Sequence, residues 1–299
     1  MSLLCIGTLA YDTIETPTDR RERSLGGSAT YFCVASASFA KPRLVGVVGT
    51  DFADEDRQLL IDKQVDVEGL EVAEGETFTW GGRYEADWNT RHTLFTNLNV
   101  FEHFDPKVPD SYKDSRFVFL ANAHPAIQLK ALLQVEKPEF VVADTMNLWI
   151  DIALDDLKAL LQNIDGLILN DEEARMLTGE ANLILAAKAV LTMGPKYVIL
   201  KKGEHGAFLM SENVHFSLPA FPVTQVVDPT GAGDSFAGGF MGEIARAGNI
   251  EPGTLRRAMV AGTATASFCV QGFSLEDIGS LTDAQIEARI QQLLEIVTV

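Results

Sequence analysis

The chain has 299 residues, of which 46% are hydrophobic, so it can bury a substantial core as one large α/β domain or two modest ones. Its 42 acidic and 24 basic residues give a formal charge of −18, which argues against nucleic acid or an anionic membrane as a general partner. Cys5, Cys33 and Cys269 are too few and too far apart to indicate a disulfide framework or a thiolate metal site. Without a basic leader or an apolar stretch of membrane-spanning length, the sequence predicts a cytoplasmic protein.

Short apolar runs alternate with segments of helical length along the chain. The runs that predict strands lie at residues 3–7, 44–48, 117–121, 140–143, 167–169 and 197–200. The segments that predict helices lie at residues 29–40, 128–135, 154–161, 183–193, 235–247, 255–270 and 282–299. This alternation is typical of a parallel sheet covered by helices on both faces, whose ligands bind where the strands end. No linker or repeat interrupts it, so we expect one main domain over residues 1–299.

Residues 76–100 depart from this alternation. They contain two runs in which apolar and polar residues alternate with a period of two, joined by a polar connection, and such runs predict a pair of antiparallel strands. The sequence leaves open whether the pair forms a structure of its own or merely extends the edge of the main sheet.

Polar residues and glycines follow several of the predicted strands. Asp12 comes just after the first strand, and Gly26 and Gly27 precede a helix, where paired glycines let the backbone approach a ligand closely. Asn170 and Glu173 follow a later strand, and a helix cap explains them equally well.

The loop after residues 197–200 reads Lys-Lys-Gly-Glu-His-Gly and starts at Lys201. Lys201 and Lys202 are candidates for holding an anion in an acidic protein, although most lysines point to solvent. Gly203 and Gly206 are equally well explained as glycines of a hairpin turn.

Residues 228–240, Asp-Pro-Thr-Gly-Ala-Gly-Asp-Ser-Phe-Ala-Gly-Gly-Phe, are the most informative stretch. The small residues Gly231, Ala232 and Gly233 let N–H groups approach a ligand just before a helix, whose N-terminus attracts phosphate. Asp234 then lies in the first turn, where a carboxylate can accept the proton of a hydroxyl that attacks a phosphoryl group. Taken alone, the stretch also fits a turn followed by an ordinary helix that Asp234 caps.

The whole stretch resembles the C-terminal signature of the PfkB family of carbohydrate kinases at every position that the signature restricts. The resemblance implies an α/β, ribokinase-like three-layer sandwich with a central, mostly parallel sheet and a small β lid. The lid would consist of residues 11–25 and 76–100. It also implies an ATP-dependent kinase that acts with Mg²⁺ on a hydroxyl of a sugar or nucleoside.

Individual roles follow from the same resemblance. Asp234 would be the general base, and the backbone of Gly231, Ala232 and Gly233 would form the anion hole. The substrate would contact Asp12, Gly26 and Gly27. Asn170 and Glu173 resemble the family's Asn-x-x-Glu motif, which organises Mg²⁺ and the phosphates. Asp228 falls where some relatives hold K⁺ through carboxylate and carbonyl oxygens.

Two positions depart from the family pattern. Tyr31 stands where many relatives have an asparagine that contacts the substrate, which puts a plain ribose or fructose pocket in doubt. Lys201 replaces the usual threonine of the nucleotide-wrapping loop, to which Lys202, Gly203 and Gly206 also belong. A cation there would contact the ATP phosphates or point to solvent.

Other classes of function fit less well. A dinucleotide-dependent oxidoreductase lacks its glycine fingerprint after the first strand, and the absence of a Gly-Lys pair excludes a Walker A nucleotidase. A non-catalytic sensor of the same fold would not need Asp234. Aromatic residues in the expected lid, with Tyr31, either stack a nucleobase or cover a core; they are Trp80, Tyr84, Trp88 and Phe95. We favour an uncharged sugar or nucleoside acceptor, and expect exposed lid edges to allow a homodimer.

Overall fold

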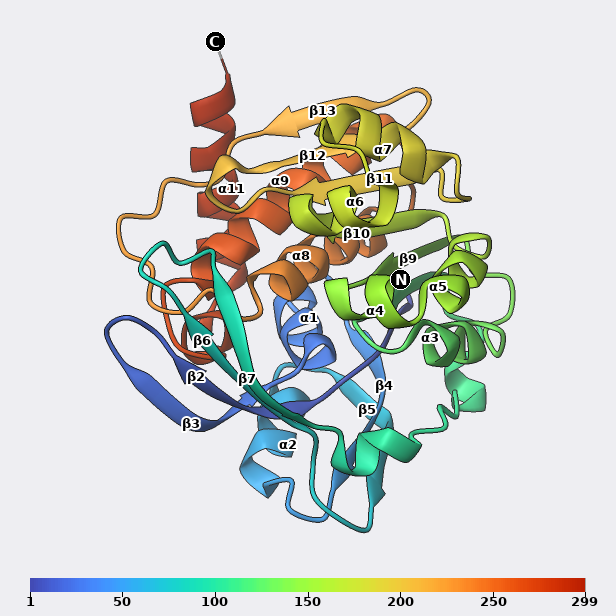
Figure 1. Ribbon diagram of the computed structural model, residues 1–299, viewed down its shortest axis with the longest axis vertical. Helices are drawn as coiled ribbons and strands as arrows, with labels where there is room; N and C mark the ends of the chain where they lie inside the picture. The colour runs from blue at the N-terminus through green and yellow to red at the C-terminus, as the bar shows by residue number, and fades with distance from the viewer. Residues whose placement is uncertain (299) are drawn as a thin grey trace.

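A nine-stranded sheet forms the centre of the computed structural model, which describes residues 1–298 (Figure 1). Seven neighbouring strands are parallel, and β12 and β13 continue the sheet antiparallel at one edge. In spatial order the strands are β13 (His215–Leu218), β12 (Ala207–Met210), β11 (Tyr197–Lys201), β10 (Gly166–Asn170), β9 (Phe140–Asp144), β8 (Phe117–Leu120), β1 (Leu3–Ile6), β4 (Pro42–Gly49) and β5 (Asp66–Ala73).

Helices cover both faces of this sheet, which explains why its central strands are apolar throughout. Every residue of β1, β8 and β9 is buried, and a strand buried on both sides has no polar face. One face packs against α1 (Ser28–Ser36), α8 (Ala232–Ala247), α9 (Pro252–Cys269), α10 (Glu276–Ser280) and α11 (Asp283–Val297). The other packs against α3 (Pro125–Leu132), α4 (Asn147–Ile152), α5 (Leu154–Leu161), α6 (Asp171–Thr178) and α7 (Leu183–Leu191). The result is three layers.

A second, four-stranded sheet, which we call the lid, lies apart from the main sheet (Figure 1). Its order is β3 (Arg20–Gly26), β2 (Ala10–Glu15), β6 (Thr79–Tyr84) and β7 (Arg91–Asn97). The strands of residues 76–100 therefore do not extend the main sheet. All seven residues of β7 are exposed, whereas Ile14 and Tyr84 of the lid are buried in a small cluster with Phe273.

The predicted strands and helices all occur, with ends that differ by a few residues, and the sheet is mostly parallel as expected. The amphipathic β5, the antiparallel β12 and β13, and the short helices α2 (Asp54–Asp62), α4 and α10 were not predicted. The terminal helix runs from Asp283 to Val297 with Thr282 as its N-cap. The predicted end of that helix, Val299, lies outside the described residues.

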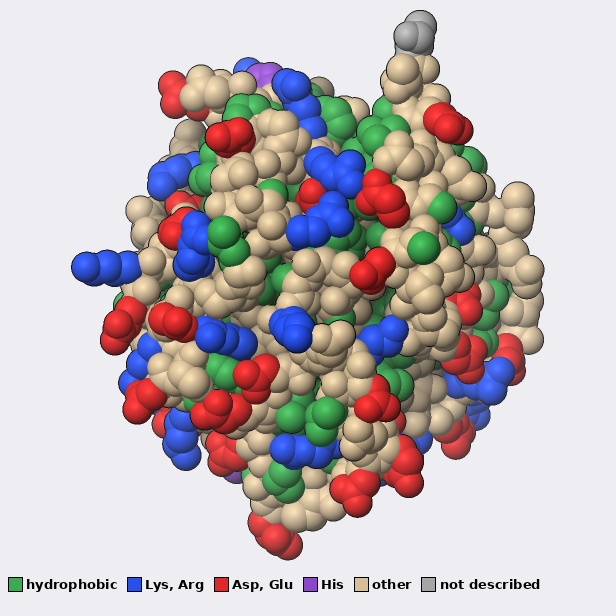
Figure 2. Space-filling view, turned by 180° about the vertical axis from the view of Figure 1, so that it is seen from behind, with side chains coloured by type: hydrophobic (Ala, Val, Ile, Leu, Met, Phe, Trp, Pro, Cys, Tyr) green, Lys and Arg blue, Asp and Glu red, His purple; other side chains and the backbone are tan. Residues whose placement is uncertain are grey.

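Charged side chains of both signs are interspersed over the face opposite to that of Figure 1 (Figure 2). Between residues 1 and 298, no helix is both long and apolar enough to cross a bilayer.

Candidate functional site

The start of α8 presents backbone N–H groups on the expected phosphate side. Gly231 caps the helix with a φ of 75°, a left-handed conformation that favours glycine. The ring of Tyr31 lies only 2.3 Å from where a Cβ of Gly231 would be, so only glycine fits. The Ala232 N–H donates to the Pro229 carbonyl at 3.2 Å. For Gly231 and Gly233, no acceptor of the N–H group occurs within residues 1–298, and these groups remain available to an anion.

Asp234 lies in the first turn of this helix, as predicted. Burial raises the pKa of its carboxyl to about 7, and the nearby Asp144 carboxylate adds to the rise. The charges of Lys201 and Arg91 act in the opposite direction and limit the shift. A carboxyl with a pKa near neutrality is well suited to accept a proton during a reaction.

Lys201 provides a fixed cation at the same helix start. It ends β11, its side chain is only 18% exposed, and its Nζ lies 2.8 Å from where a Cβ of Gly233 would be. The ammonium group also lies 3.5 Å from Oδ1 of Asp144, which ends β9. The carboxylates of Asp144, Glu173 and Asp234 together raise the pKa of Lys201 against the effect of burial. Lys201 therefore does not point to solvent.

Asn170 and Glu173 form a reciprocal helix cap beside this cation. The Asn170 side chain accepts the Glu173 N–H, and the Glu173 carboxylate accepts the Asn170 N–H, each at 2.8 Å. The cap interpretation is therefore correct, and it does not remove Glu173 from the site. Burial raises the pKa of Glu173 to about 7, while the charge of Lys201 opposes that rise. Glu173 thus both starts α6 and faces the cation.

Asp12 lies on the acceptor side of the expected site, on lid strand β2. Its carboxylate packs against Gly26, where any side chain would collide with Oδ2. Burial raises the pKa of Asp12 to about 8, the charges of Asp228 and Asp234 raise it further, and an N–H bond from Gly27 opposes the rise. Asp12, Gly26 and Gly27 are therefore brought together, and Asp12 is 4% exposed rather than solvated.

Two tyrosines flank the same region. Tyr84 of the lid accepts a hydrogen bond from Thr230 Oγ1 at 3.1 Å, which ties the lid to the segment before Gly231. Tyr31 is 1% exposed, and its hydroxyl has no hydrogen-bond partner within the described residues. The charges of Asp12 and Asp228 contribute to the high pKa of Tyr31, after burial. The Tyr31 hydroxyl is therefore a buried polar group beside Asp12 that has no hydrogen-bond partner among residues 1–298.

Asp228 is fully buried beside this group. Its Oδ1 accepts the Thr230 N–H at 2.8 Å and its Oδ2 accepts the Ser274 N–H at 3.4 Å. Burial raises the pKa of Asp228, and these hydrogen bonds oppose the rise. The side chain thus shapes the turn that leads into α8. Within residues 1–298 no three His, Cys, Asp or Glu side chains lie close enough together to hold a metal ion by themselves.

The loop from Lys202 to Gly206 is a hairpin turn between β11 and β12. The Lys202 N–H donates to the Gly206 carbonyl at 2.8 Å, and Gly203 and Gly206 both have positive φ, so the hairpin interpretation of these glycines is correct. The side chain of Asn89, at the tip of the lid, lies 3.1 Å from where a Cβ of Gly203 would be. The lid therefore reaches this loop.

Two residues of the site were not predicted from the sequence. Asp144 ends β9, one residue beyond the predicted strand, and its signal was a lone acidic residue at the end of an apolar run. Arg91 was not among the candidate site residues, and its charge acts on both Asp234 and Glu173. Its place depends on the pairing of lid strands, which the sequence does not specify.

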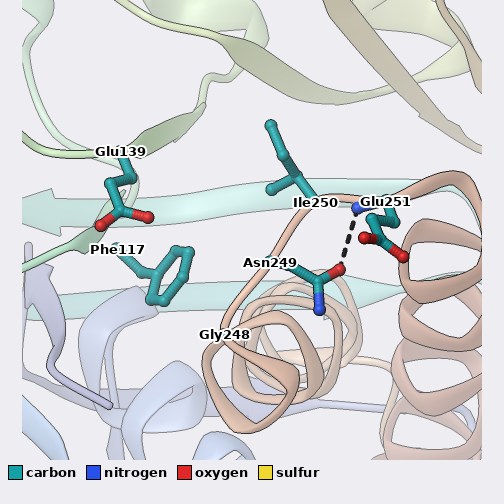
Figure 3. Close-up of a pocket in the computed structure, with 6 residues that line it drawn as sticks. All are labelled: Phe117, Glu139, Gly248, Asn249, Ile250 and Glu251. Carbon is teal, nitrogen blue, oxygen red and sulfur yellow. Dashed lines mark hydrogen bonds between the residues drawn. The ribbon is translucent and has the colours of Figure 1, made fainter.

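A hollow of about 350 Å³ lies elsewhere, near the N-terminal end of β8 and the C-terminal end of α8 (Figure 3). Its lining includes Phe117, Glu139 and Asn249. In Figure 3 the Asn249 side chain accepts the Glu251 N–H, at 3.0 Å. None of the predicted site residues borders this hollow.

Comparisons with known proteins agree with the geometry. A family model described as pfkB family carbohydrate kinase matches residues 2–278. The chain is 29% identical over 258 residues to a cytidine kinase from Thermococcus kodakarensis, covering 84% of this chain and 91% of that protein. It is 28% identical to a nucleoside kinase from Methanothermobacter thermautotrophicus, covering 94% and 91%. It resembles the structure of aminoimidazole riboside kinase from Salmonella enterica, complexed with aminoimidazole riboside and an ATP analogue, with a TM-score of 0.78, 19% identity and coverage of 97% and 100%.

Proposed function

Because the chain belongs to the pfkB family of carbohydrate kinases, we propose that it transfers the γ-phosphoryl group of ATP to a hydroxyl group of a nucleoside. Its family and relatives make it a kinase for a sugar or nucleoside, and its fold is ribokinase-like. They give no support to a non-catalytic sensor. A nucleoside is favoured over a sugar because both relatives described above are named for nucleosides.

The observation that carries the catalytic part is the position of Asp234. Its carboxyl has a pKa raised to about 7, and it lies beside the free N–H groups of α8 and the cation of Lys201. In the proposed reaction Asp234 accepts the proton of the attacking hydroxyl. The N–H groups of Gly231 and Gly233 hold the phosphoryl oxygens while negative charge develops on them.

The donor side fits the phosphates of ATP. Lys201 supplies a buried positive charge, and Asp144 holds it at 3.5 Å. The hairpin glycines Gly203 and Gly206, with Lys202, would lie along the nucleotide. A bound Mg²⁺ would neutralise phosphate charge, and it needs few carboxylates because it keeps several waters. Glu173, with Asn170 to orient it, is the residue that we assign to the shell of that ion.

The acceptor side fits an uncharged polyol such as a ribose. Asp12 presents a buried carboxyl, and Gly26 and Gly27 leave room for the backbone to approach a hydroxyl. The free hydroxyl of Tyr31 is a further partner for the substrate. Trp80 lies on the same face of the lid as Asp12, since the two residues are neighbours in the parallel β2–β6 pair. A nucleobase that stacks on Trp80 would place the ribose near Asp12.

The test is a panel of acceptors with ATP and Mg²⁺, comprising pyrimidine nucleosides, purine nucleosides, ribose, fructose and fructose 6-phosphate. We expect kcat/KM to be at least about tenfold higher for one nucleoside than for any sugar. A higher kcat/KM for a sugar would reject the nucleoside assignment and leave the kinase intact. Activity with none of them, under conditions in which the protein is folded, would reject both.

A K⁺ ion beside Asp228 is proposed as an accessory ligand. Both carboxylate oxygens of Asp228 already accept N–H groups, so backbone carbonyl oxygens would have to supply most of its coordination. Replacing K⁺ by tetramethylammonium at constant ionic strength should lower kcat if the ion is bound. Unchanged kcat would remove K⁺ from the site.

We also propose a homodimer formed through the lid, in the cytoplasm. Strand β7 is an edge strand, and its exposed residues include Leu94 at 43% and Phe95 at 38%. Such an edge can pair with a second copy. The three cysteines are free and buried, as is usual in a reducing compartment. Sedimentation of the wild-type chain and of Leu94→Lys, which should be monomeric, tests the dimer.

A further inference from the structure

We propose that Arg91 is a catalytic residue, which contacts the transferred phosphoryl group from the lid. This inference rests on the proposed function, because it concerns the same reaction. It assigns to the lid a part in the chemistry, in addition to covering the acceptor. The argument depends on which face of the lid Arg91 occupies, on what its guanidinium contacts and on where the lid tip lies.

The strand register places Arg91 on the inner face of the lid. Arg91 is the partner of Tyr84 in the antiparallel β6–β7 pair, and paired residues point to the same side of a sheet. Tyr84 is 8% exposed and packs against Ile14 and Phe273. The hydroxyl of Tyr84 contacts Thr230, next to the start of α8. Arg91 therefore extends from the face that covers the reacting groups.

The guanidinium of Arg91 has donors to spare. It lies 5.4 Å from the centroid of the Trp80 ring, and within residues 1–298 it forms no ion pair or hydrogen bond. By contrast, Arg20, Arg21 and Arg23 on lid strand β3 all pair with carboxylates. The planar fork of an arginine matches two oxygens of a phosphoryl group, and stacking on an aromatic ring leaves its edge free for them.

The charge of Arg91 acts on both sides of the reaction. Burial raises the pKa of Asp234, the proposed base, and of Glu173, on the donor side, and the charge of Arg91 opposes both rises. It also lowers the pKa of Tyr84, on the acceptor side. The three groups belong to both sides of the proposed reaction, so the charge of Arg91 is felt by the donor side and by the acceptor side.

The lid tip, residues 87–90, keeps Arg91 close to the donor loop. Asp87 caps the tip by accepting the N–H groups of Asn89 and Thr90 at 3.0 and 2.8 Å. The Asn89 side chain then meets Gly203 of the donor loop. Arg91 directly follows Thr90 and is the first residue of β7. The contact between Asn89 and the donor loop therefore fixes the start of the strand that carries Arg91.

In the proposed step, the acceptor oxygen forms a bond to the γ-phosphorus while the bond from that phosphorus to the β,γ-bridging oxygen breaks. The hydroxyl proton passes to Asp234, and the electron pair of the broken bond stays on the ADP that leaves. Arg91 donates N–H bonds to the oxygens of the transferring group. Because charge grows there in the transition state, these bonds accelerate the reaction more than they aid binding.

The test compares Arg91→Ala with Arg83→Ala. Arg83 is the matched control because it lies in the neighbouring strand, is also exposed and has no ion pair within residues 1–298, but pairs with His92 and thus points outward. We expect Arg91→Ala to lower kcat by about 10²-fold, with KM for ATP and for the nucleoside changed by less than about threefold. Arg91→Lys should lose about tenfold, because it keeps the charge without the fork. Arg83→Ala should remain within about twofold of wild type.

A second readout separates chemistry from folding. Removing Arg91 should move the acid limb of the kcat–pH profile to higher pH, because its charge lowers the pKa of Asp234. Equal losses in Arg91→Ala and Arg83→Ala, or a higher KM for the nucleoside with normal kcat, would overturn the inference. If Arg91→Ala melts at a lower temperature than wild type, Arg91→Lys decides by the same criteria. A wild-type chain without kinase activity would instead overturn the proposed function, and this inference with it.

Discussion

The donor side and the acceptor side of the site are built differently. On the donor side, Lys201, Asp144 and Glu173 come from the ends of neighbouring parallel strands or the helix that follows, and they compensate one another's charge. On the acceptor side, the lid and α1 bring together Asp12 and Tyr31. Besides burial, the charges of Asp228 and Asp234 raise the pKa of Asp12, and neither Asp12 nor Tyr31 has a cationic partner among residues 1–298. One side is electrostatically complete, and the other is not.

This difference indicates what each side requires from its ligand. The residues that we propose for the donor side are fixed by the main sheet and would hold their charges in place before ATP binds, which is the condition for electrostatic preorganisation. The acceptor side leaves a hydroxyl unpaired and a carboxyl with a raised pKa, each of which costs free energy until a substrate pairs with it. If these residues bind the acceptor as we propose, the folded protein is less stable without its substrate than it would be with these groups paired.

The largest effect is expected at Asp234, which lies between the two sides. Asp234→Asn keeps the size of the side chain and the start of α8, but it removes the proton acceptor. We expect kcat to fall by about 10³-fold, with binding of a non-hydrolysable ATP analogue largely intact. Single-turnover kinetics and calorimetry with the analogue measure the two quantities. Near-normal turnover would show that Asp234 is not the base.

A second prediction concerns the donor side alone. Lys201→Met removes the buried cation at α8, and we expect kcat to fall by about 10²-fold. The KM for the nucleoside should change by less than about threefold, since that side does not contact Lys201. Lys158→Met is the control, because this exposed lysine of α5 lies outside the proposed site and has no charged partner in the part of the chain that the structure describes. If the two variants behave alike, Lys201 is not a phosphate ligand.

Much of the donor side could be predicted from the sequence, because strand ends and glycines are local signals. Gly231, Gly233 and Asp234 needed only the position of one helix start. Asp144 was missed, although it follows directly on a predicted strand. The sequence showed that Lys201 departs from the family pattern, but not whether its side chain points into the site. That orientation depends on Asp144, which lies 57 residues away in the sequence.

The acceptor side was harder to predict because three distant segments form it. Tyr31 was assigned from its position alone, and its free hydroxyl depends on how α1, Gly231 and the lid pack together. The face that Arg91 occupies depends on the β6–β7 register, which shifts between Gly81 and Gly82. A shift of one residue reverses the face of every side chain, and a period-two pattern does not reveal it.

A third prediction uses pH. The base must be ionised to accept a proton, and burial raises the pKa of Asp234 to about 7. The kcat/KM for the nucleoside should therefore fall about tenfold for each pH unit below 7. An ordinary aspartate would stay ionised down to about pH 4. In Lys201→Met the limb should move to higher pH, because the lysine charge lowers this pKa. A limb that does not respond to Lys201 would belong to a group other than Asp234 or Glu173.

The smallest expected effect is on stability, and it tests the acceptor side. Tyr31→Phe removes a buried hydroxyl that has no partner among residues 1–298. An unsatisfied buried hydroxyl costs about 1–3 kcal/mol, so we expect the free energy of unfolding without ligand to rise by about 1 kcal/mol. Tyr84→Phe is the control, because it breaks the bond to Thr230 and should lower that free energy by about 1 kcal/mol.

Tyr31→Phe should also bind the nucleoside more weakly. If the Tyr31 hydroxyl forms a hydrogen bond with the acceptor, Tyr31→Phe should be more stable than wild type without ligand. Adding nucleoside should then stabilise Tyr31→Phe less than it stabilises wild type. Thermal denaturation of wild type, Tyr31→Phe and Tyr84→Phe, each with and without nucleoside, measures both effects. A Tyr31→Phe chain that is less stable than wild type without ligand would mean that the hydroxyl already has a partner, such as a bound water. The Tyr31 hydroxyl of the acceptor side would then be paired without ligand. An unpaired hydroxyl would no longer explain how the acceptor side binds its substrate.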